Sequence, residues 1–256
     1  MKKFLALLLV LTTICCFFTA CDSDEPVEVE KQATIDSTKL IMATNAAFPP
    51  YEYKDGETFK GIDVEIAEAI AAELGLKLEI RDMEFDSIIT SVSNSETDMG
   101  MAGMTVTDER KKQIDFSRSY ATGVQVIIVN EDSAIQSDKD LADKKIGVQL
   151  GTTGDIYATD DFGANNVTQY GKGADAIIAL KGGDVDAVII DNEPAKAFVE
   201  ANPGLKILDT EYAVEDYAIA VKKGNTELLD KINDALVKLK ENGKIDEIIA
   251  KYITVE

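Results

Sequence analysis

The chain contains no histidine and only three cysteines, which limits the chemistry that it can perform. A Ser-His-Asp triad needs histidine, and protein zinc sites are built mainly from histidine and cysteine. Cys15 and Cys16 lie in an apolar segment that we expect to be removed, so Cys21 alone would remain and no disulfide could form. These absences exclude nucleophilic triads and histidine- or cysteine-based metal sites and leave only carboxylates, lysine, tyrosine, serine and threonine for catalysis, so we expect no metal, no cofactor and no enzymatic activity.

Basic residues are scarce as well. The 256 residues include 26 lysines and arginines against 47 aspartates and glutamates, which gives a formal net charge of −21. A surface that acidic repels phosphate groups, which argues against nucleic acid as a partner and against electrostatic adhesion to anionic lipid. Any attachment to a membrane must therefore have another source.

The start of the chain lacks an apolar run long enough to cross a membrane. The run from Phe4 to Phe18 is shorter than the ~20 residues that a spanning helix needs, and it follows two lysines and ends just before Thr19-Ala20-Cys21. Thr19-Ala20-Cys21 resembles the lipobox of bacterial lipoproteins. We predict a lipoprotein signal peptide over residues 1–20 and a lipid anchor on the sulfur of Cys21, with an ordinary signal peptide and a chance cysteine as the alternative.

Residues 21–36 are acidic and nearly free of large apolar side chains, which predicts a flexible tether between the lipid and the folded body. Removal of the signal peptide takes away Lys2 and Lys3 and no acids, so the mature chain would carry a net charge of −23. Membrane attachment of this chain would then depend on the lipid at Cys21.

Beyond the tether, short apolar runs alternate with amphipathic stretches, an order typical of α/β folds with mostly parallel sheets. Asp63 is the expected N-cap of the first helix, and Gly75 is its expected end. The expected strands are 40–44, 76–80, 98–104, 124–129, 145–149, 167–170, 185–190, 206–208 and 217–221, and the expected helices include 61–74, 86–93, 154–159, 174–181, 194–201 and two after residue 225. This pattern indicates lobe 1 from residues 37–120 and 217–256 and lobe 2 from residues 125–212, joined by a hinge at 120–124 and 213–217.

The stretch from Asp98 to Tyr120, DMGMAGMTVTDERKKQIDFSRSY, predicts a strand, a tight turn and a helix with Thr107 at its N-cap. Arg110 would then stand in the first turn, where a cation opposes the positive end of the helix dipole. A bound anion would explain this position, because a guanidinium offers a fork of donors that suits a carboxylate. A solvated arginine on a surface helix is the alternative.

Further candidate residues follow the carboxyl ends of the predicted strands, where ligands of open α/β sheets bind. We therefore expect them to line one ligand cleft between the lobes. Those of lobe 1 are Asn45, Phe48, Phe85, Gly103, Met104 and Thr105, and those of lobe 2 are Gln149, Thr152, Thr153 and Asp191. Core packing is the alternative for the two phenylalanines, and a surface turn is the alternative for Asp191.

Several segments together resemble one protein family. AGMTVTDERKKQIDFS followed by a tyrosine, FKGIDVEIAEAIAAELG, MEFDSII, QLGTTGD and GGDVDAVIIDN are similar to signatures of the polar amino-acid-binding proteins that serve ABC importers. This is solute-binding family 3, which contains the glutamine, histidine and lysine/arginine/ornithine binders. The resemblance covers roughly residues 36 to 254 and implies a two-lobed periplasmic-binding-protein-like fold (type II) with a two-strand hinge.

The resemblance also implies roles for the candidate residues. Arg110, Thr105 and the backbone near Thr153 would hold the α-carboxylate of an L-amino acid, because a buried zwitterion needs a partner for each of its charges. Asp191, Gly103 and Thr105 would hold the α-ammonium group. Phe48 and Phe85 would enclose the side chain.

Three departures from the family pattern bear on the ligand. Asn45 stands where many relatives with cationic or amide ligands have an aspartate, and Gln149 stands where the glutamine binder has a lysine. Ile190 precedes Asp191 where a histidine can occur, and these changes remove charge from the distal end of the cleft. We therefore expect a neutral polar or medium-sized side chain rather than a cationic one.

The resemblance finally implies location and partners. We expect a monomer that is anchored through Cys21 to the outer face of the bacterial cytoplasmic membrane, binds a free L-amino acid and delivers it to the transmembrane subunits of an ABC permease. A ligand-sensing domain that acts with a membrane receptor is one alternative, and a dehydratase of the same fold is another.

Overall fold

The structure is a computed structural model that describes residues 38–253. The predicted signal peptide, Cys21 and the acidic tether lie outside the described residues. Within residues 38–253, no helix is both long enough and apolar enough to cross a membrane.

A nine-stranded sheet forms the centre of the described chain, in the order β5-β1-β6-β12-β7-β10-β8-β9, with β11 also paired to β7. Pairing is parallel between β1 and its neighbours β5 and β6, and between β8 and its neighbours β9 and β10. It is antiparallel wherever β7 and β12 take part. The strands are β1 Lys39–Thr44, β5 Lys77–Asp82, β6 Met99–Gly100, β7 Ile114–Asn130, β8 Ile146–Gln149, β9 Val167–Tyr170, β10 Ala187–Asp191, β11 Leu205–Ile207 and β12 Ala213–Lys222.

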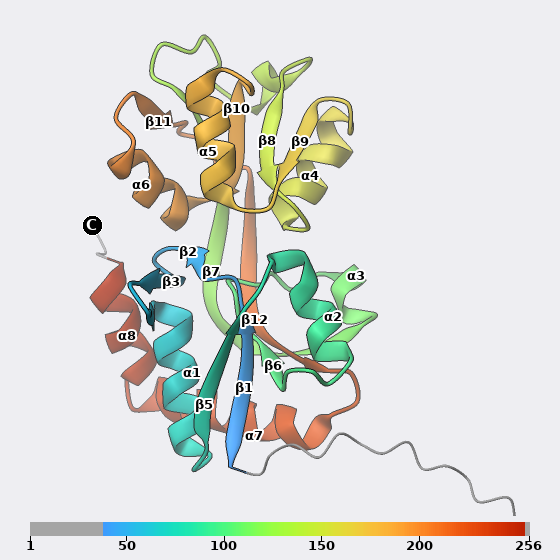
Figure 1. Ribbon diagram of the computed structural model, residues 1–256, viewed down its shortest axis with the longest axis vertical. Helices are drawn as coiled ribbons and strands as arrows, with labels where there is room; N and C mark the ends of the chain where they lie inside the picture. Colours follow the sequence, from blue (N-terminus) through green and yellow to red (C-terminus); the bar gives the residue numbers. More distant parts are fainter. Residues whose placement is uncertain (1–37, 254–256) are drawn as a thin grey trace, which may run out of the picture. The chain divides into compact units, whose positions relative to one another are not determined.

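Helices cover the two ends of this sheet. Figure 1 shows α1, α2, α7 and α8 beside β1 and β5, and α4, α5 and α6 beside β8, β9 and β10. The helices are α1 Ile62–Glu73, α2 Ile88–Ser93, α3 Asp108–Lys111, α4 Thr153–Phe162, α5 Gly173–Gly182, α6 Asn192–Ala201, α7 Thr226–Glu241 and α8 Lys244–Tyr252, with short 3-10 helices at Phe85–Ser87 and Asp138–Leu141.

Separate hydrophobic clusters give the two ends their own cores, which we call lobe 1 and lobe 2. In lobe 1, Met42 of β1 and Ile66 of α1 pack with Leu236 of α7. In lobe 2, Val188 of β10 packs with Leu180 of α5. Each fully buried side chain of this size stabilises the fold by about 1.5–3 kcal/mol, so both lobes have a substantial core.

The long strands β7 and β12 connect the lobes. They are paired from Gln125 and Ala213 at one end to Ile114 and Lys222 at the other, with register shifts near Ala218. The hinge segments predicted at 120–124 and 213–217 therefore lie inside continuous strands, which extend well beyond the strands expected at 124–129 and 217–221.

A small antiparallel sheet of β2 Ala47–Phe48, β3 Glu52–Asp55 and β4 Thr58–Lys60 was not expected from the sequence. Its strands are two to four residues long, too short for a periodic pattern to show. Because β2 directly follows β1, this sheet places Phe48 beside the carboxyl end of that strand.

Two local predictions need correction. Asp63 is not the N-cap of α1, because Gly61 occupies that position and Asp63 is fully buried inside the first turn. The helix after Thr107 is only four residues long, although Thr107 does cap it by accepting a hydrogen bond from the Arg110 N–H. Arg110 therefore opposes no extended helix dipole, and its burial rather than its helix position makes it unusual.

Candidate functional site

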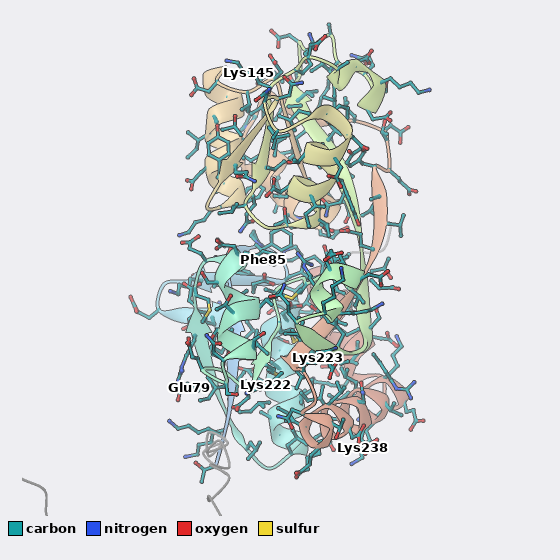
Figure 2. All side chains as sticks on the ribbon, turned by 90° about the vertical axis from the view of Figure 1, so that its right-hand side faces the viewer. Glu79, Phe85, Lys145, Lys222, Lys223 and Lys238 are labelled. Carbon is teal, nitrogen blue, oxygen red and sulfur yellow. The ribbon has the colours of Figure 1, made fainter. Side chains whose placement is uncertain are left out.

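The carboxyl ends of the strands from both lobes meet, and hydrogen bonds cross from one lobe to the other there. Arg110 Nη2 donates to the carbonyl of Gly151 at 3.0 Å, and Gln149 Nε2 donates to Asn45 Oδ1 at 2.9 Å. Figure 2 shows Phe85 on the side of lobe 1 that faces lobe 2. The structure thus brings together residues that the sequence had placed at separate strand ends.

Arg110 is 5% exposed, although its charge is not matched by an ion pair to any described carboxylate. Its Nη1 donates to the carbonyl of Thr105 at 2.7 Å, and its guanidinium carbon lies 5.4 Å from the centre of the Phe85 ring. Burial lowers the pKa of Arg110 to about 10, and the nearby Glu215 counteracts this shift. A buried guanidinium with three donors still unused is suited to bind a carboxylate.

Hydroxyl groups from both lobes converge on one carboxylate oxygen. Thr105 Oγ1 and Thr153 Oγ1 are 3.4 Å apart, and they donate to Glu215 Oε2 at 3.1 and 2.8 Å. Gln125 Nε2 donates to the same oxygen at 3.0 Å. The Thr153 hydroxyl is therefore engaged, and the N–H groups at the start of α4 are the donors that this loop can offer to an anion.

Asp191 ends β10 and is 1% exposed. It accepts hydrogen bonds from the Tyr217 hydroxyl and, at 3.4 Å, from the N–H of Glu193. Burial raises the pKa of Asp191 to about 7, against lowering by the Tyr217 bond. A buried acid with so high a pKa favours a cationic partner, and such groups concentrate at functional sites.

Phe48 and Phe85 both lie where the two lobes meet. A Cβ added at Gly103 would lie 3.0 Å from a carbon of the Phe48 ring, which is closer than ordinary van der Waals contact. Phe48 also packs against the hydrophobic clusters of both lobes. The distal amides are already paired, because Asn45 Nδ2 donates to the Met83 carbonyl at 2.8 Å and its Oδ1 accepts from Gln149.

Two of the candidate residues occupy structural positions. The side chain of Met104 is fully buried in a lobe 1 core cluster with Phe85 and Ile88. Thr152 caps α4: its hydroxyl accepts from the Asp155 N–H at 3.3 Å and donates to the Gln149 carbonyl at 2.8 Å. A direct contact of either side chain with a ligand stays a prediction.

The sequence interpretation gave no role at the site to three buried acids, Glu52, Asp63 and Glu215. Asp63 Oδ2 accepts from the Gly103 N–H and from the Tyr120 hydroxyl, both at 2.8 Å, and so holds the backbone of a candidate ligand contact. Burial raises the pKa of Asp63 to about 7, and burial next to Asp63 raises the pKa of Glu52 well above its usual value. Glu215 lies outside the strand expected at 217–221, and only the longer β12 of the structure places it on the same buried face as Tyr217.

A separate groove of about 370 Å³ lies between β7 and α7, lined among others by Arg118, Thr122, Leu236 and Lys240. It contains none of the candidate residues and no buried charged group. The region where the lobes meet, which contains the buried Arg110 and Asp191, is therefore the better candidate for a ligand site.

Comparisons with known proteins bear on the family and the fold of the chain. The family model of bacterial extracellular solute-binding proteins, family 3, matches residues 40–255. The arginine-binding extracellular protein ArtP of Bacillus subtilis (strain 168) is 37% identical over 266 residues, covering 100% of both chains. An ancestral arginine-binding protein, solved with bound glutamine, is 42% identical with a TM-score of 0.81, over 85% of this chain and 98% of that chain. The arginine-, lysine-, histidine-binding protein ArtJ of Geobacillus stearothermophilus is 37% identical with a TM-score of 0.82, over 86% and 96%.

Fold and site together define a two-lobed protein of the periplasmic-binding-protein class, with its candidate site between the lobes. The chain belongs to family 3 of the bacterial extracellular solute-binding proteins, and its relatives are amino-acid-binding proteins of ABC transporters. The predicted family and fold are confirmed. Family membership places the protein outside the cytoplasm.

Proposed function

We propose that this protein binds an L-amino acid between its two lobes and delivers it to an ABC importer without catalysing a reaction. The observation that carries the proposal is the buried pair of opposite charges, Arg110 of lobe 1 at 5% exposure and Asp191 of lobe 2 at 1%. Arg110 would bind the α-carboxylate, and Asp191 would bind the α-ammonium group. Each end of a zwitterion would thereby gain a desolvated, charged partner.

Closure of the lobes would follow from this division of contacts. Arg110 and Thr105 belong to lobe 1, whereas Thr153 and Asp191 belong to lobe 2. A ligand that contacts both lobes binds the closed state better than the open state, and it shifts the equilibrium by that difference in affinity. The strands β7 and β12 would serve as the hinge.

For the side chain of the ligand, we propose a cationic amino acid, with arginine as the first candidate. The neutral side chain predicted from Asn45 and Gln149 has less support among the relatives compared, whose names specify arginine or histidine more often than the neutral cystine, although one ancestral arginine-binding protein was solved with bound glutamine. The two amides bond to each other, so their lack of charge does not decide the charge of the cleft. Among the described residues that are buried, Arg110 is the only basic one, against the acids Glu52, Asp63, Asp155, Asp191 and Glu215.

Isothermal titration of ligand-stripped protein with each of the twenty L-amino acids tests both parts of this proposal. We expect micromolar or tighter binding of arginine and weaker binding of neutral amino acids. If no amino acid bound more tightly than millimolar, amino-acid binding would be refuted. If a neutral amino acid bound most tightly, the cationic side chain would be refuted while the binding function would stand.

We further propose that the protein is monomeric and attached to the membrane by lipid on Cys21. Lipid attachment can be tested by expressing the full chain and its Cys21→Ser variant in cells that are fed labelled palmitate. We expect label on the wild-type chain only, and release of the variant from the membrane fraction. Label on both chains, or on neither, would contradict lipidation at Cys21.

A further inference from the structure

We propose that Glu215 is a further ligand-binding residue, whose free oxygen Oε1 accepts a hydrogen bond from the α-ammonium group of the amino acid. This inference rests on the proposed function and adds a second carboxylate to the cation-binding end of the cleft. Glu215 lies on β12, the hinge strand, and not on either set of loops from which the other candidate residues come.

The two oxygens of Glu215 have different surroundings. Oε2 accepts three hydrogen bonds, from Thr105, Thr153 and Gln125, at 3.1, 2.8 and 3.0 Å. Oε1 is buried and accepts no hydrogen bond within residues 38–253, although the Tyr157 hydroxyl lies close enough to interact with the carboxylate, and the residue as a whole is 5% exposed. A buried carboxylate oxygen without a donor is costly, so this atom is suited to accept a donor that arrives with a ligand.

The hinge places the side chain of Glu215 on the same face of the sheet as Asp191. Glu215 pairs with Gly123 of β7, and side chains of paired residues in antiparallel strands share a face of the sheet. A Cβ added at Gly123 would lie 2.3 Å from both Asp191 Oδ2 and the Tyr217 hydroxyl. Glu215, Asp191 and Tyr217 therefore lie on one face of the hinge ribbon, and the absence of a side chain at Gly123 makes room for them.

The hydrogen bonds around Glu215 also decide what this side of the cleft can bind. Because Thr105 and Thr153 donate their hydroxyl protons to Glu215, they can offer only lone pairs to a ligand. Glu215 Oε1 and Asp191 add further acceptors. A surface made of acceptors and negative charge is complementary to an ammonium group, which brings three donors and a positive charge.

The alternative is that Glu215 mimics the α-carboxylate of the ligand and occupies the position that this carboxylate would take. A mimic of that kind should form an ion pair with Arg110. The described residues contain no such ion pair, and Arg110 bonds instead to the carbonyls of Thr105 and Gly151. The geometry thus favours Glu215 as a partner of the ammonium group.

The test compares two probes that differ only in the α-amino group, L-arginine and 5-guanidinopentanoic acid. Their dissociation constants are measured by calorimetry, with displacement titrations for weak binding, on the wild type, Glu215→Gln and Asp216→Asn. Asp216 is the matched control, because it is the neighbouring acid on the same strand and its side chain is exposed. Thermal melts without ligand check that each variant folds.

We expect Glu215→Gln to weaken L-arginine binding by about tenfold to a hundredfold, the loss typical of one hydrogen bond to a charged group. Its effect on 5-guanidinopentanoic acid should stay within about twofold, since that probe lacks the group that Glu215 binds. Asp216→Asn should change neither probe. An equal loss for both probes would show that Glu215 only holds the lobes together, and no loss for L-arginine would show that it has no role; either result overturns the inference.

Failure of the proposed function would look different. If the wild-type protein itself did not bind L-arginine, the assignment of a cationic amino acid would fail before any variant was compared. Binding of L-arginine by the wild type together with either of the two results above would refute the role of Glu215 alone.

Discussion

Replacement of Arg110 by alanine would show how much of the affinity depends on one buried guanidinium. The side chain has five N–H donors, and its bonds to the Thr105 and Gly151 carbonyls, at 2.7 and 3.0 Å, leave three for a ligand. Truncating one partner of a desolvated charge pair costs about 2–5 kcal/mol. We therefore expect the dissociation constant for L-arginine to rise by roughly thirty-fold to several thousand-fold.

The fold should survive this change. The variant loses two hydrogen bonds, each with a net contribution of about 0.5–1.5 kcal/mol, so the free energy of unfolding should fall by about 1–3 kcal/mol. Calorimetric titration gives the affinity, and melts with and without L-arginine give the ligand-induced rise in Tm, which should largely vanish. Arg118→Ala is the control, because Arg118 is exposed on β7.

Two results would refute the reasoning on Arg110. Affinity within about threefold of the wild type, a difference below 1 kcal/mol, would mean that Arg110 does not hold the carboxylate. Loss of the folded state would mean that its buried hydrogen bonds mainly maintain the structure.

Three further predictions concern Asp191, Gly123 and Gln149. Burial raises the pKa of Asp191 to about 7, so the folded protein holds this proton more tightly than the unfolded chain does. The contribution of Asp191 to the free energy of unfolding of the unliganded protein is therefore fully present below about pH 4 and is lost as pH rises through 7. Pairing with an ammonium group requires the ionised form of Asp191, so L-arginine should bind more tightly as pH rises from 5.5 to 7.5. Calorimetry in buffers of different ionisation enthalpy should detect the release of protons on binding. An affinity that does not change with pH would contradict this prediction. Gly123→Ala should weaken binding and lower the free energy of unfolding by about 1–3 kcal/mol, because the new Cβ would overlap Asp191 and Tyr217; an unchanged Tm and affinity would show that the hinge adapts without cost. Gln149→Ala removes the hydrogen bond between Gln149 and Asn45, which joins the two lobes. The closed state should therefore be less stable and the affinity lower by about threefold to tenfold, with little effect on the Tm of the unliganded protein. A large drop in that Tm would show that the amide pair stabilises the lobes themselves.

Elements with strong periodicity could be predicted from the sequence. The strand 167–170 has the predicted bounds, and the helices expected at 174–181 and 194–201 begin and end within two residues of α5 and α6. Local pattern was sufficient there because each segment buries one face against its own lobe. Pattern also placed Thr105 and Asp191 at strand ends and Arg110 in the first turn of the helix that follows Thr107.

The long hinge strands could not be predicted to their full length. Within β7, the side chains of Arg118, Ser119 and Thr122 are exposed, which interrupts the alternation that marks a strand. Pairing with β12 keeps this stretch extended, and that contact links residues about a hundred positions apart. Tertiary hydrogen bonding therefore decides the local structure here.

Glu215 could not be recognised from sequence for a related reason. It follows the polar segment Asp209 to Glu211 and precedes Asp216, a composition typical of a surface loop. Only the fold shows that Glu215 is buried while Asp216, one residue further, is exposed. The two acids differ in which face of β12 they occupy, and that face depends on the register with β7.

A crystal structure with L-arginine would test the central claim most directly, since it locates both charged ends of the ligand. The account predicts the amino acid between the lobes, with its α-carboxylate within hydrogen-bond distance of the Arg110 guanidinium and the N–H groups that begin α4, and its α-ammonium group beside Asp191. Arginine bound elsewhere, or bound in the cleft with its carboxylate turned away from Arg110, would contradict the account.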